Sequence, residues 1–275
     1  MSRTMLLCLN WFGFWIRRFD FNDAVCVVTG GSSGIGRCLA IELAHRGANV
    51  IVVARRKERL AKLENQFDRI HAVVGDITNE DDWTRIRDAA ASLSDSGEID
   101  LLVNNAGCGG IGPFMESDPA RLDQIMNVNF LAPIKLTRFL HPQLCNSNRP
   151  VVCNIGSVLG DVGVPNKAEY CAAKAAMAKW SQSLRAELWK SGIAVVLVSP
   201  STTKSEFFDS LVGTPEGTTS SSIAAFQQTP QTVARVTAMA IRLRVAHVQP
   251  SAGGYLLSLG QRLFPWMMNW VLRQR

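Results

Sequence analysis

The chain has 275 residues, which is enough for one large domain with a substantial core. Hydrophobic residues make up 47% and charged residues 19%, a balance that excludes a disordered chain, and no repeat is visible. The net charge of +6 suits an anionic cofactor, a membrane surface or a nucleic acid, but no nucleic-acid-binding motif accompanies it. We therefore expect no nucleic-acid partner.

Seven cysteines are scattered along the chain without a Cys-x-x-Cys pair. An odd number of cysteines, several of them in predicted core segments, indicates free thiols in a reducing compartment and not a disulfide framework. The four histidines are far apart and have no metal-ligand spacing to the cysteines, so we expect no metal site. These observations favour a cytoplasmic protein.

Both ends of the chain are apolar and carry arginines. The apolar run within residues 1–18 is too short to span a bilayer, which takes about 20 residues, and it lacks a small-residue cleavage site. Residues 255–275 have the character of a helix that is apolar on most of its circumference. Each end is therefore predicted to lie peripherally at a membrane surface, to pack on its own domain or to dock on a partner subunit.

Between the two ends, short apolar runs alternate with amphipathic helical segments. Strands are predicted at residues 24–29, 49–54, 71–74, 101–103, 150–155 and 194–198. Helices are predicted at residues 37–46, 56–67, 80–94, 119–140, 167–189 and 230–244. This alternation predicts an α/β fold, a single Rossmann-type, doubly wound parallel sheet flanked by helices on both faces.

We expect this domain to span residues 22–250, with residues 1–21 as an apolar N-terminal extension and 251–275 as an amphipathic C-terminal extension. Residues 200–228 lose all periodicity and are rich in Ser, Thr, Gly and Pro. A loop of this length inside a compact domain is usually functional, so we expect the substrate determinants to lie there.

A glycine-rich turn, TGGSSGIG at residues 29–36, joins the first strand to the first helix. Its glycines Gly30, Gly34 and Gly36 let the chain turn tightly and let a phosphate approach backbone amides at the helix N-terminus. The turn therefore predicts a dinucleotide-binding site. The alternative is a tight strand–helix turn that holds no ligand.

Three arginines lie near this turn. The second strand ends in Ala54-Arg55-Arg56, at the place where an acidic residue would bind a free ribose 2′-hydroxyl. Arg37 adds a third cation just after the last glycine. Because guanidinium groups bind phosphate through paired, charge-assisted hydrogen bonds, we expect the phosphorylated cofactor, NADP(H).

Tyr170 and Lys174 are one turn apart on the predicted helix 167–189, so their side chains share a face. A nearby ammonium should lower the pKa of the phenol from its ordinary value of about 10. Ser157 follows the fifth strand, where its hydroxyl can bind a substrate carbonyl that the phenol protonates. The alternative for the pair is a half-buried tyrosine beside a solvated lysine.

With these motifs the chain resembles the short-chain dehydrogenase/reductase family over about residues 22–245. It matches the family's T-G-x-x-x-G-x-G at 29–36, its N-N-A-G at 104–107 and its Ser…Tyr-x-x-x-Lys, with Ser157 thirteen positions before Tyr170. The resemblance implies that Tyr170 is the general acid in reduction. It also implies that Lys174 lowers the pKa of Tyr170 and holds the nicotinamide ribose, and that Ser157 orients the carbonyl.

The resemblance further implies a fourth catalytic residue, Asn129, which would support a water-mediated proton relay to the lysine. Asn127 is its nearby competitor. Asp76 would contact the adenine. The whole cofactor-binding set implied in this way is Gly30, Ser32, Ser33, Gly34, Ile35, Gly36, Arg37, Arg55, Arg56, Asp76, Ile77, Asn105, Ala106, Gly107, Tyr170, Lys174 and Thr203.

The chain departs from the family pattern after the sixth strand. It has Pro200-Ser201 where the family usually has Pro-Gly, which raises a question about the local backbone, and Ser205 replaces a threonine. Cys108 and Cys171 flank the expected site. We interpret them as small packing residues and not as redox sensors.

The implied activity is reversible hydride transfer between NADP(H) and a ketone or alcohol, in a homodimer or homotetramer that assembles through helices 119–140 and 167–189. The TGGSSGIG and VARR segments together with the apolar ends are similar to those of membrane-associated members that reduce lipid ketones, such as 3-ketosphinganine reductases. The alternatives are a catalytically silent NADP(H)-sensing protein and a membrane-tethered binding protein.

Overall fold

The computed structural model describes residues 18–94, 96–204, 211–212 and 227–273. The predictions for residues 1–17 of the N-terminal extension, for Ser205 and for most of the 200–228 loop fall outside these residues. Phe19 and Phe21, at the end of the predicted extension, are described and are buried in the core of the domain. The described part of the chain contains the glycine-rich turn, the N-N-A-G segment, and Ser157, Tyr170 and Lys174.

A seven-stranded sheet in the order β3-β2-β1-β4-β5-β6-β7 forms the centre of the molecule, and every ladder in it is parallel. Its strands are β1 (Val25–Thr29), β2 (Asn49–Ala54), β3 (Ile70–Val74), β4 (Leu101–Asn104), β5 (Val151–Ile155), β6 (Ala194–Val198) and β7 (His247–Val248). The strand order reverses between β1 and β4, and at such a switch point the carboxyl ends of the strands leave a crevice for a ligand. The predicted Rossmann-type parallel sheet is confirmed.

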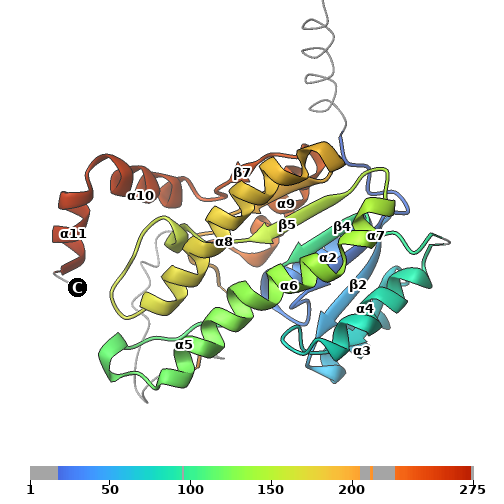
Figure 1. Cartoon of the computed structure of the whole chain (residues 1–275), viewed down its shortest axis with the longest axis horizontal. Coiled ribbons are helices and arrows are strands. Elements are labelled where there is room, and N and C mark those ends of the chain that lie inside the picture. The colour runs from blue at the N-terminus through green and yellow to red at the C-terminus, as the bar shows by residue number, and fades with distance from the viewer. Residues whose placement is uncertain (1–17, 95, 205–210, 213–226, 274–275) are drawn as a thin grey trace, which may run out of the picture.

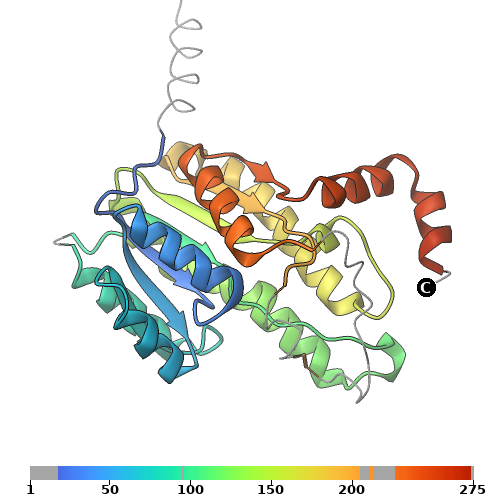
Figure 2. The same ribbon diagram turned by 180° about the vertical axis from the view of Figure 1, so that it is seen from behind.

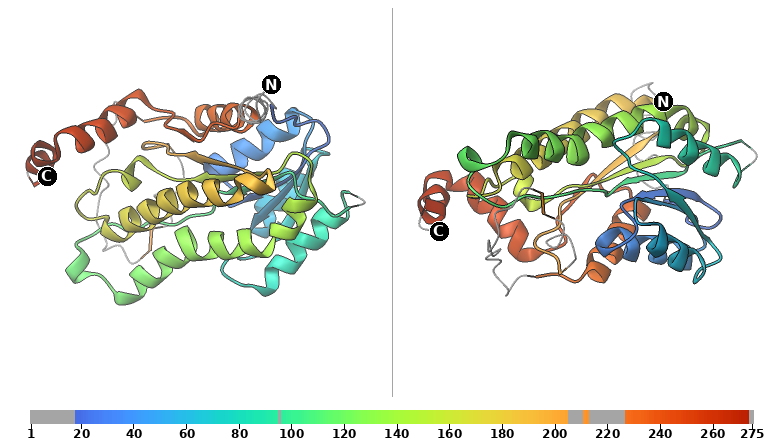
Figure 3. Two further views of the ribbon diagram at one scale, coloured as in Figure 1. Left: turned by 45° about the horizontal axis from the view of Figure 1, so that its top comes forward. Right: turned by 90° about the horizontal axis from the view of Figure 1, so that it is seen from below.

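Helices cover both faces of the sheet (Figures 1 and 3). One layer consists of α2 (Gly34–His45), α3 (Lys57–Glu64) and α9 (Pro230–Arg242), and the other of α4 (Asp81–Ala91), α6 (Ala132–Phe139) and α8 (Ala168–Glu187). Each layer has its own core. Leu39, Leu43 and Ile241 are buried in the first core, and Trp83 and Leu136 in the second.

The helix predicted at 119–140 consists of three pieces. It begins as α5 (Pro119–Met126), continues as a π turn, η2 (Asn127–Leu131), and resumes as α6. Asp118 caps α5 by accepting a hydrogen bond from the Ala120 N–H. A short helix, α7 (His141–Asn146), follows α6. Residue periodicity alone does not reveal a single extra residue inside a helix.

Several short elements differ from the prediction. Periodicity predicted six strands and missed β7, whose two residues are too few to show a pattern. The helix predicted at 167–189 changes after Glu187 to a 3₁₀ turn, η4 (Leu188–Ser191). Two further 3₁₀ turns, η1 (Phe114–Glu116) and η3 (Val158–Gly160), lie in connections.

The described C-terminal segment forms two helices, α10 (Ala252–Leu263) and α11 (Pro265–Arg273). Ser251 caps α10 by accepting a hydrogen bond from the Gly254 N–H at 3.2 Å, and Pro265 begins α11. Seen from either side, the two helices extend away from the sheet (Figures 1 and 2). Within the described ranges, no helix has both the length and the apolar character needed to cross a bilayer.

Candidate functional site

The glycine-rich turn at the end of β1 leaves no room for side chains at two positions. Gly30 has a φ of 69°, and a Cβ there would lie 2.7 Å from the Ala106 Cα. A Cβ on Gly36 would lie 2.6 Å from the Gly30 carbonyl oxygen. Contacts this short are prohibitive, so only glycine fits at both positions. The turn therefore brings the backbone and the N-terminus of α2 close to any group bound above it.

The N-N-A-G segment after β4 is bonded directly to this turn. The Thr29 hydroxyl accepts hydrogen bonds from the Asn105 N–H at 3.0 Å and the Ala106 N–H at 3.1 Å, and it donates to the Val103 carbonyl at 3.2 Å. The Asn105 Nδ2 donates to the Thr29 carbonyl at 2.8 Å. The two segments, far apart in sequence, thus form the two walls of the crevice at the switch point.

Beneath this crevice lies a buried polar chain that the sequence analysis did not include. The Asn104 Nδ2 donates to the Asn154 Oδ1 at 2.8 Å, and the Asn154 Nδ2 donates to the Ser181 Oγ at 2.9 Å. All three residues are almost fully buried. These bonds join β4, β5 and α8. Because an unpaired buried amide lowers the stability of the fold, these hydrogen bonds fix the position of the three elements relative to one another.

The three predicted arginines surround the mouth of the glycine-rich turn but differ in their contacts. The Arg56 Nε and Nη2 donate to the Ser32 Oγ at 3.1 and 2.9 Å. Arg55 is mostly exposed and lies 3.6 Å, Nη1 to Oδ2, from Asp76. Arg37, on the first turn of α2, lines a cavity beside the glycine-rich turn.

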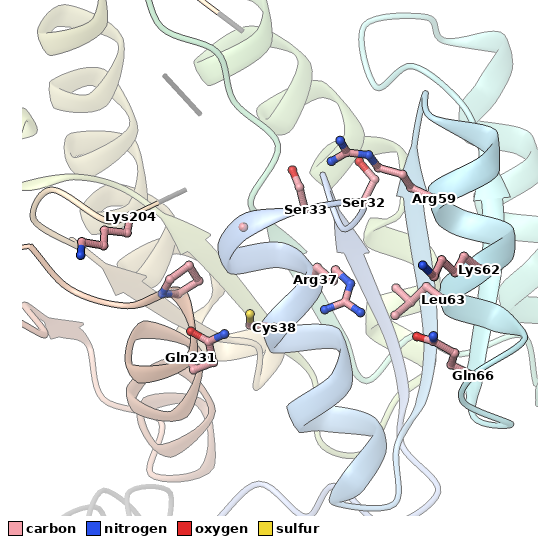
Figure 4. A pocket seen from close by; sticks show the side chains of 12 residues that line it. Ser32, Ser33, Arg37, Cys38, Arg59, Lys62, Leu63, Gln66, Lys204 and Gln231 are labelled. Carbon is pink, nitrogen blue, oxygen red and sulfur yellow. The ribbon is translucent and has the colours of Figure 1, made fainter. Parts of the chain in front are cut away.

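This cavity has a volume of about 440 Å³ and is strongly cationic (Figure 4). Besides Ser32, Ser33 and Arg37, it is lined by three cations that the sequence analysis missed: Arg59, Lys62 and Lys204. Arg59 and Lys62 are three residues apart on α3, a spacing that places both on one face and could have revealed them. A cavity with these cations beside a helix N-terminus is suited to a phosphate group.

Asp76 and Ile77 follow β3 at the same edge of the sheet. The Asp76 Oδ1 accepts hydrogen bonds from the Thr78 N–H at 2.9 Å and the Thr78 Oγ1 at 2.8 Å. Ile77 is buried in the core, where its carbonyl accepts a bond from the Trp83 Nε1 at 2.9 Å. The Asp76 carboxylate is therefore held at the site in a fixed orientation, while the side chain of Ile77 points into the core.

Ser157, Tyr170 and Lys174 are brought together at the carboxyl end of β5. The Ser157 hydroxyl caps η3 by accepting a hydrogen bond from the Leu159 N–H at 3.1 Å, and it is also hydrogen-bonded to the Tyr170 hydroxyl. The Lys174 Nζ lies 5.7 Å from the centroid of the Tyr170 ring. It donates a hydrogen bond to the Ile155 carbonyl at 2.8 Å. Serine, phenol and ammonium thus lie within reach of one small reacting group.

The pKa of Tyr170 differs from the expectation. Burial raises it well above its ordinary value, and this effect outweighs the hydrogen bond with Ser157, which acts to lower it. The same burial lowers the pKa of Lys174 to about 8. Desolvation is the largest cause of the Tyr170 shift, and the lowering of the Tyr170 pKa by Lys174 stays a prediction. A raised pKa favours the protonated form of the phenol.

Asn129 lies in the π turn and faces the site. Its Nδ2 donates to the Cys108 carbonyl at 2.8 Å and to the Ile125 carbonyl, four residues back, at 2.9 Å. The side chain is 1% exposed, and its Oδ1 is buried without a hydrogen-bond partner among the described residues. A buried acceptor of this kind suits a bound water molecule. Asn127, the competitor, is only partly buried.

Cys108 and Cys171 flank the site, as the sequence indicated. Burial raises the pKa of both thiols, so they remain protonated and weakly reactive. Their interpretation as packing residues agrees with this environment.

An ion pair beside Tyr170 was not anticipated. The Arg121 Nε and Nη2 donate to the Glu169 Oε1 at 2.9 and 2.7 Å, and both side chains are 1% exposed. Arg121 also donates to the carbonyls of Ile111 and Gly112 at 3.4 and 3.3 Å. The pair therefore ties α5 and the loop after β4 to the first turn of α8, where Tyr170 lies.

After β6 the chain turns without the expected glycine. The residues with positive φ in the described ranges, glycines aside, are Asp23, Asn166 and Arg244. Ser201 is not one of them, so the Pro200-Ser201 step has a backbone that any residue adopts. Thr203 is buried, and its hydroxyl donates to the Ser201 carbonyl at 3.1 Å.

The residues present fit a nicotinamide dinucleotide. Two glycines form a cradle that a Cβ would fill, a cationic cavity adjoins it, and the Ser157–Tyr170–Lys174 group lies at the other end. The described residues can orient a carbonyl through a hydroxyl and deliver a proton to its oxygen from a phenol.

Comparison with known proteins gives one consistent result. Residues 24–215 match the family model described as short chain dehydrogenase. A Pinus massoniana protein named 11-beta-hydroxysteroid dehydrogenase is 33% identical over 204 residues, which are 72% of this chain and 56% of that protein. The chain thus spans little more than half the length of that relative.

Two solved structures share the fold. A short chain dehydrogenase/reductase from Burkholderia phymatum, in complex with NAD, has a TM-score of 0.80 at 24% identity and covers 89% of this chain and 94% of its own. A short chain dehydrogenase from Burkholderia cenocepacia, in complex with NADP, has a TM-score of 0.78 at 26% identity and covers 92% of this chain and 99% of its own.

Proposed function

The chain belongs to the short-chain dehydrogenase/reductase family, an oxidoreductase family, and on that basis we propose that it is an NADP(H)-dependent carbonyl reductase. It would reduce a ketone or aldehyde to an alcohol and catalyse the reverse oxidation. The observation that carries this proposal is the hydrogen-bonded Ser157–Tyr170 pair with Lys174 beside it, next to the cationic dinucleotide cradle. Bound nicotinamide would supply the hydride chemistry.

Each catalytic residue has a role that follows from its position. Ser157 would hold the carbonyl oxygen of the substrate, and Tyr170 would donate its Oη proton to that oxygen. A raised phenol pKa is compatible with this role, because an alkoxide is a much stronger base than a phenolate. Lys174 would bind the ribose next to the nicotinamide, and Asn129 would hold a water that returns a proton toward Lys174.

The preference for NADP(H) is proposed from the cations around the glycine-rich turn. Arg37, Arg55 and Arg56 approach it from α2 and from the end of β2, and no acidic residue stands at the end of β2 to accept a free 2′-hydroxyl. The two Burkholderia structures contain NAD in one case and NADP in the other. The choice between the two cofactors therefore depends on this chain's own arginines.

Replacing both Arg55 and Arg56 by Gln should weaken NADPH binding by about 10- to 100-fold, because a hydrogen bond to a charged group is worth about 1.5–3 kcal/mol. NADH affinity should be nearly unchanged. Fluorescence titration with both cofactors measures the difference. The double variant R138Q/R235Q removes the same charge from exposed positions on α6 and α9 and is the matched control. An equal loss of NADH affinity in R55Q/R56Q would show that the arginines bind a part common to both cofactors.

The value of kcat/KM for NADPH should fall as the pH rises through about 8. That ratio reports the free enzyme, in which burial lowers the pKa of Lys174 to about 8. Below this pH Lys174 is an ammonium that can hold the ribose, and above it the amine is neutral, so the ratio should fall about tenfold per pH unit. A K174R variant, whose guanidinium stays charged, should show a lower but flat profile. A fall that persists near pH 8 in K174R would assign it to another group.

We propose a bulky apolar ketone as the substrate class, with lipid ketones such as 3-keto sphingoid bases as the leading case. Large apolar side chains are exposed in the connection between β4 and α5, with Met115 on η1 92% exposed and Phe114 46% exposed. The name of the pine relative refers to a steroid, which is also bulky and apolar.

We also propose a homodimer or homotetramer formed through the helices from α5 to α6 and α8, where Leu122 and Leu131 are exposed.

The experiment that tests this function is NADPH consumption by the purified protein against small ketones, quinones and 3-keto lipids, with the Y170F variant assayed in parallel. Turnover that disappears in the variant would support the reductase mechanism, and the best substrate would define the class. Tight NADPH binding without turnover on any carbonyl would contradict it and favour a nucleotide-sensing protein.

A further inference from the structure

The C-terminal arm, defined as α10 and α11 (residues 252–273), is largely unburied. It extends away from the sheet in every view (Figures 1 to 3). Gly254 is the one buried residue of α10, and α11 has none. The exposed fractions are 65% for Leu256, 73% for Trp266 and 60% for Trp270. Such a concentration of exposed apolar side chains on one segment indicates a binding surface.

The composition of the arm limits what can cover it. Residues 252–273 contain no Asp or Glu, and their charged residues are Arg262 and Arg273, both exposed. Trp266, Met267, Trp270 and Arg273 line a single hollow on α11 to which no residue of the sheet or of its helices contributes within the described ranges. Tryptophan beside arginine on an amphipathic helix is the typical composition of a segment at a lipid interface.

We propose that the C-terminal arm docks the protein on the surface of an anionic lipid bilayer. At 1.5 Å per residue, α10 and α11 are about 18 and about 14 Å long, so neither crosses the hydrocarbon core, and both lie in the interface plane. Arg262 and Arg273 then face lipid phosphates, and Trp266 and Trp270 enter the headgroup region.

The charge of the arm favours a lipid surface over a second copy of the chain as the occupant. Arg262 and Arg273 are the only charged residues of the arm, so two copies that docked arm to arm would bring like charges together. An anionic bilayer has negatively charged headgroups for the arginines of the arm and an apolar interior for its exposed apolar side chains.

The root of the arm lies next to the catalytic turn. A Cβ on Gly254 would be 3.2 Å from the Val158 Cγ1, and Val158 directly follows Ser157. The Gln249 Nε2 donates to the Asp161 Oδ2 at 2.7 Å, after η3, and to the Ser258 Oγ on α10 at 3.0 Å. Docking would thus hold the Ser157 side of the crevice near the bilayer. In this respect the inference rests on the proposed reduction of an apolar ketone.

The test is co-sedimentation of the full-length protein with phosphatidylcholine vesicles, with and without phosphatidylglycerol. The W266S/W270S variant should bind at least about tenfold more weakly than wild type. The R262Q/R273Q variant should lose about fivefold per arginine on anionic vesicles only, since the electrostatic attraction is to the lipid charge. The matched controls are M239S, an exposed apolar side chain on α9, and R138Q/R235Q. Both controls should bind like wild type.

Unchanged vesicle binding in both arm variants would overturn the proposal. So would a drop in oligomeric state of W266S/W270S in sedimentation velocity without loss of vesicle binding, because the arm would then be a subunit interface. Reduction of a water-soluble ketone without vesicles should be the same in wild type and in both arm variants. If wild type reduces no ketone, the reductase function fails, while vesicle binding still reports on the arm.

Discussion

Y170F should lower kcat for carbonyl reduction by about 10²–10⁴-fold, the usual contribution of a positioned general acid. The variant keeps the aromatic ring and removes only the hydroxyl that is hydrogen-bonded to Ser157. Cofactor affinity should change by less than about tenfold, because one neutral hydrogen bond is worth about 0.5–1.5 kcal/mol. Steady-state kinetics with a water-soluble ketone and fluorescence titration of NADPH measure the two effects separately.

The chain provides a matched control for this substitution. Tyr255 is its other tyrosine, 57% exposed on α10, and Y255F removes the same atom from a solvent-exposed side chain. It should leave kcat on a water-soluble ketone unchanged. A Y170F variant that retains the wild-type kcat would show that a different group supplies the proton.

The second large effect concerns the buried ion pair beside the site. R121M should lower the free energy of unfolding by about 3–5 kcal/mol, because it leaves the Glu169 carboxylate buried without its partner. It also removes the donor to the carbonyls of Ile111 and Gly112. Urea-induced unfolding, followed by far-ultraviolet circular dichroism, measures the change.

Two further variants separate the ion pair from general effects of the substitution. In R121M/E169M the uncompensated carboxylate is gone as well, so this variant should be more stable than R121M alone. K135M breaks the exposed Lys135–Glu80 pair on the surface and should cost less than about 1 kcal/mol. If R121M were no more destabilised than K135M, the buried Arg121–Glu169 pair would contribute no more to the stability of the folded state than an exposed pair does.

The fold and the grouping of the main site residues follow from the sequence because parallel strands bring their carboxyl ends to one edge. Residues one or two positions after a strand, such as Gly30, Asp76, Asn105 and Ser157, therefore meet there although they are far apart in the chain. Tyr170 and Lys174 join them because an i, i+4 pair on a helix shares one face. The parallel strands and the helical spacing thus account for the grouping, whereas the roles of Asp76 and Asn105 were implied only by the family resemblance.

The features that were missed depend on three-dimensional packing. Arg121 and Glu169 are 48 residues apart, and neither stands in a local pattern that reveals its partner. Lys204 reaches the cationic cavity from a segment without periodicity. The direction of the Tyr170 pKa shift depends on whether burial or a neighbouring charge dominates. The sequence shows that a charged residue is near, but it does not show how deeply the phenol is buried.

The π turn from Asn127 to Leu131 makes the helix between the crevice and the second core sensitive to length. Its Ala132 N–H bonds the Asn127 carbonyl, five residues back, so the turn accommodates one residue more than an α-helix would. Loss of one residue between Met126 and Asn129 would restore a regular α-helix, so α6 would keep its orientation relative to α5, while Asn129 would rotate by about 100° relative to α5. Asn129 would then leave the crevice although Leu136 stays in the core, so the position of Asn129 depends on the length of this turn.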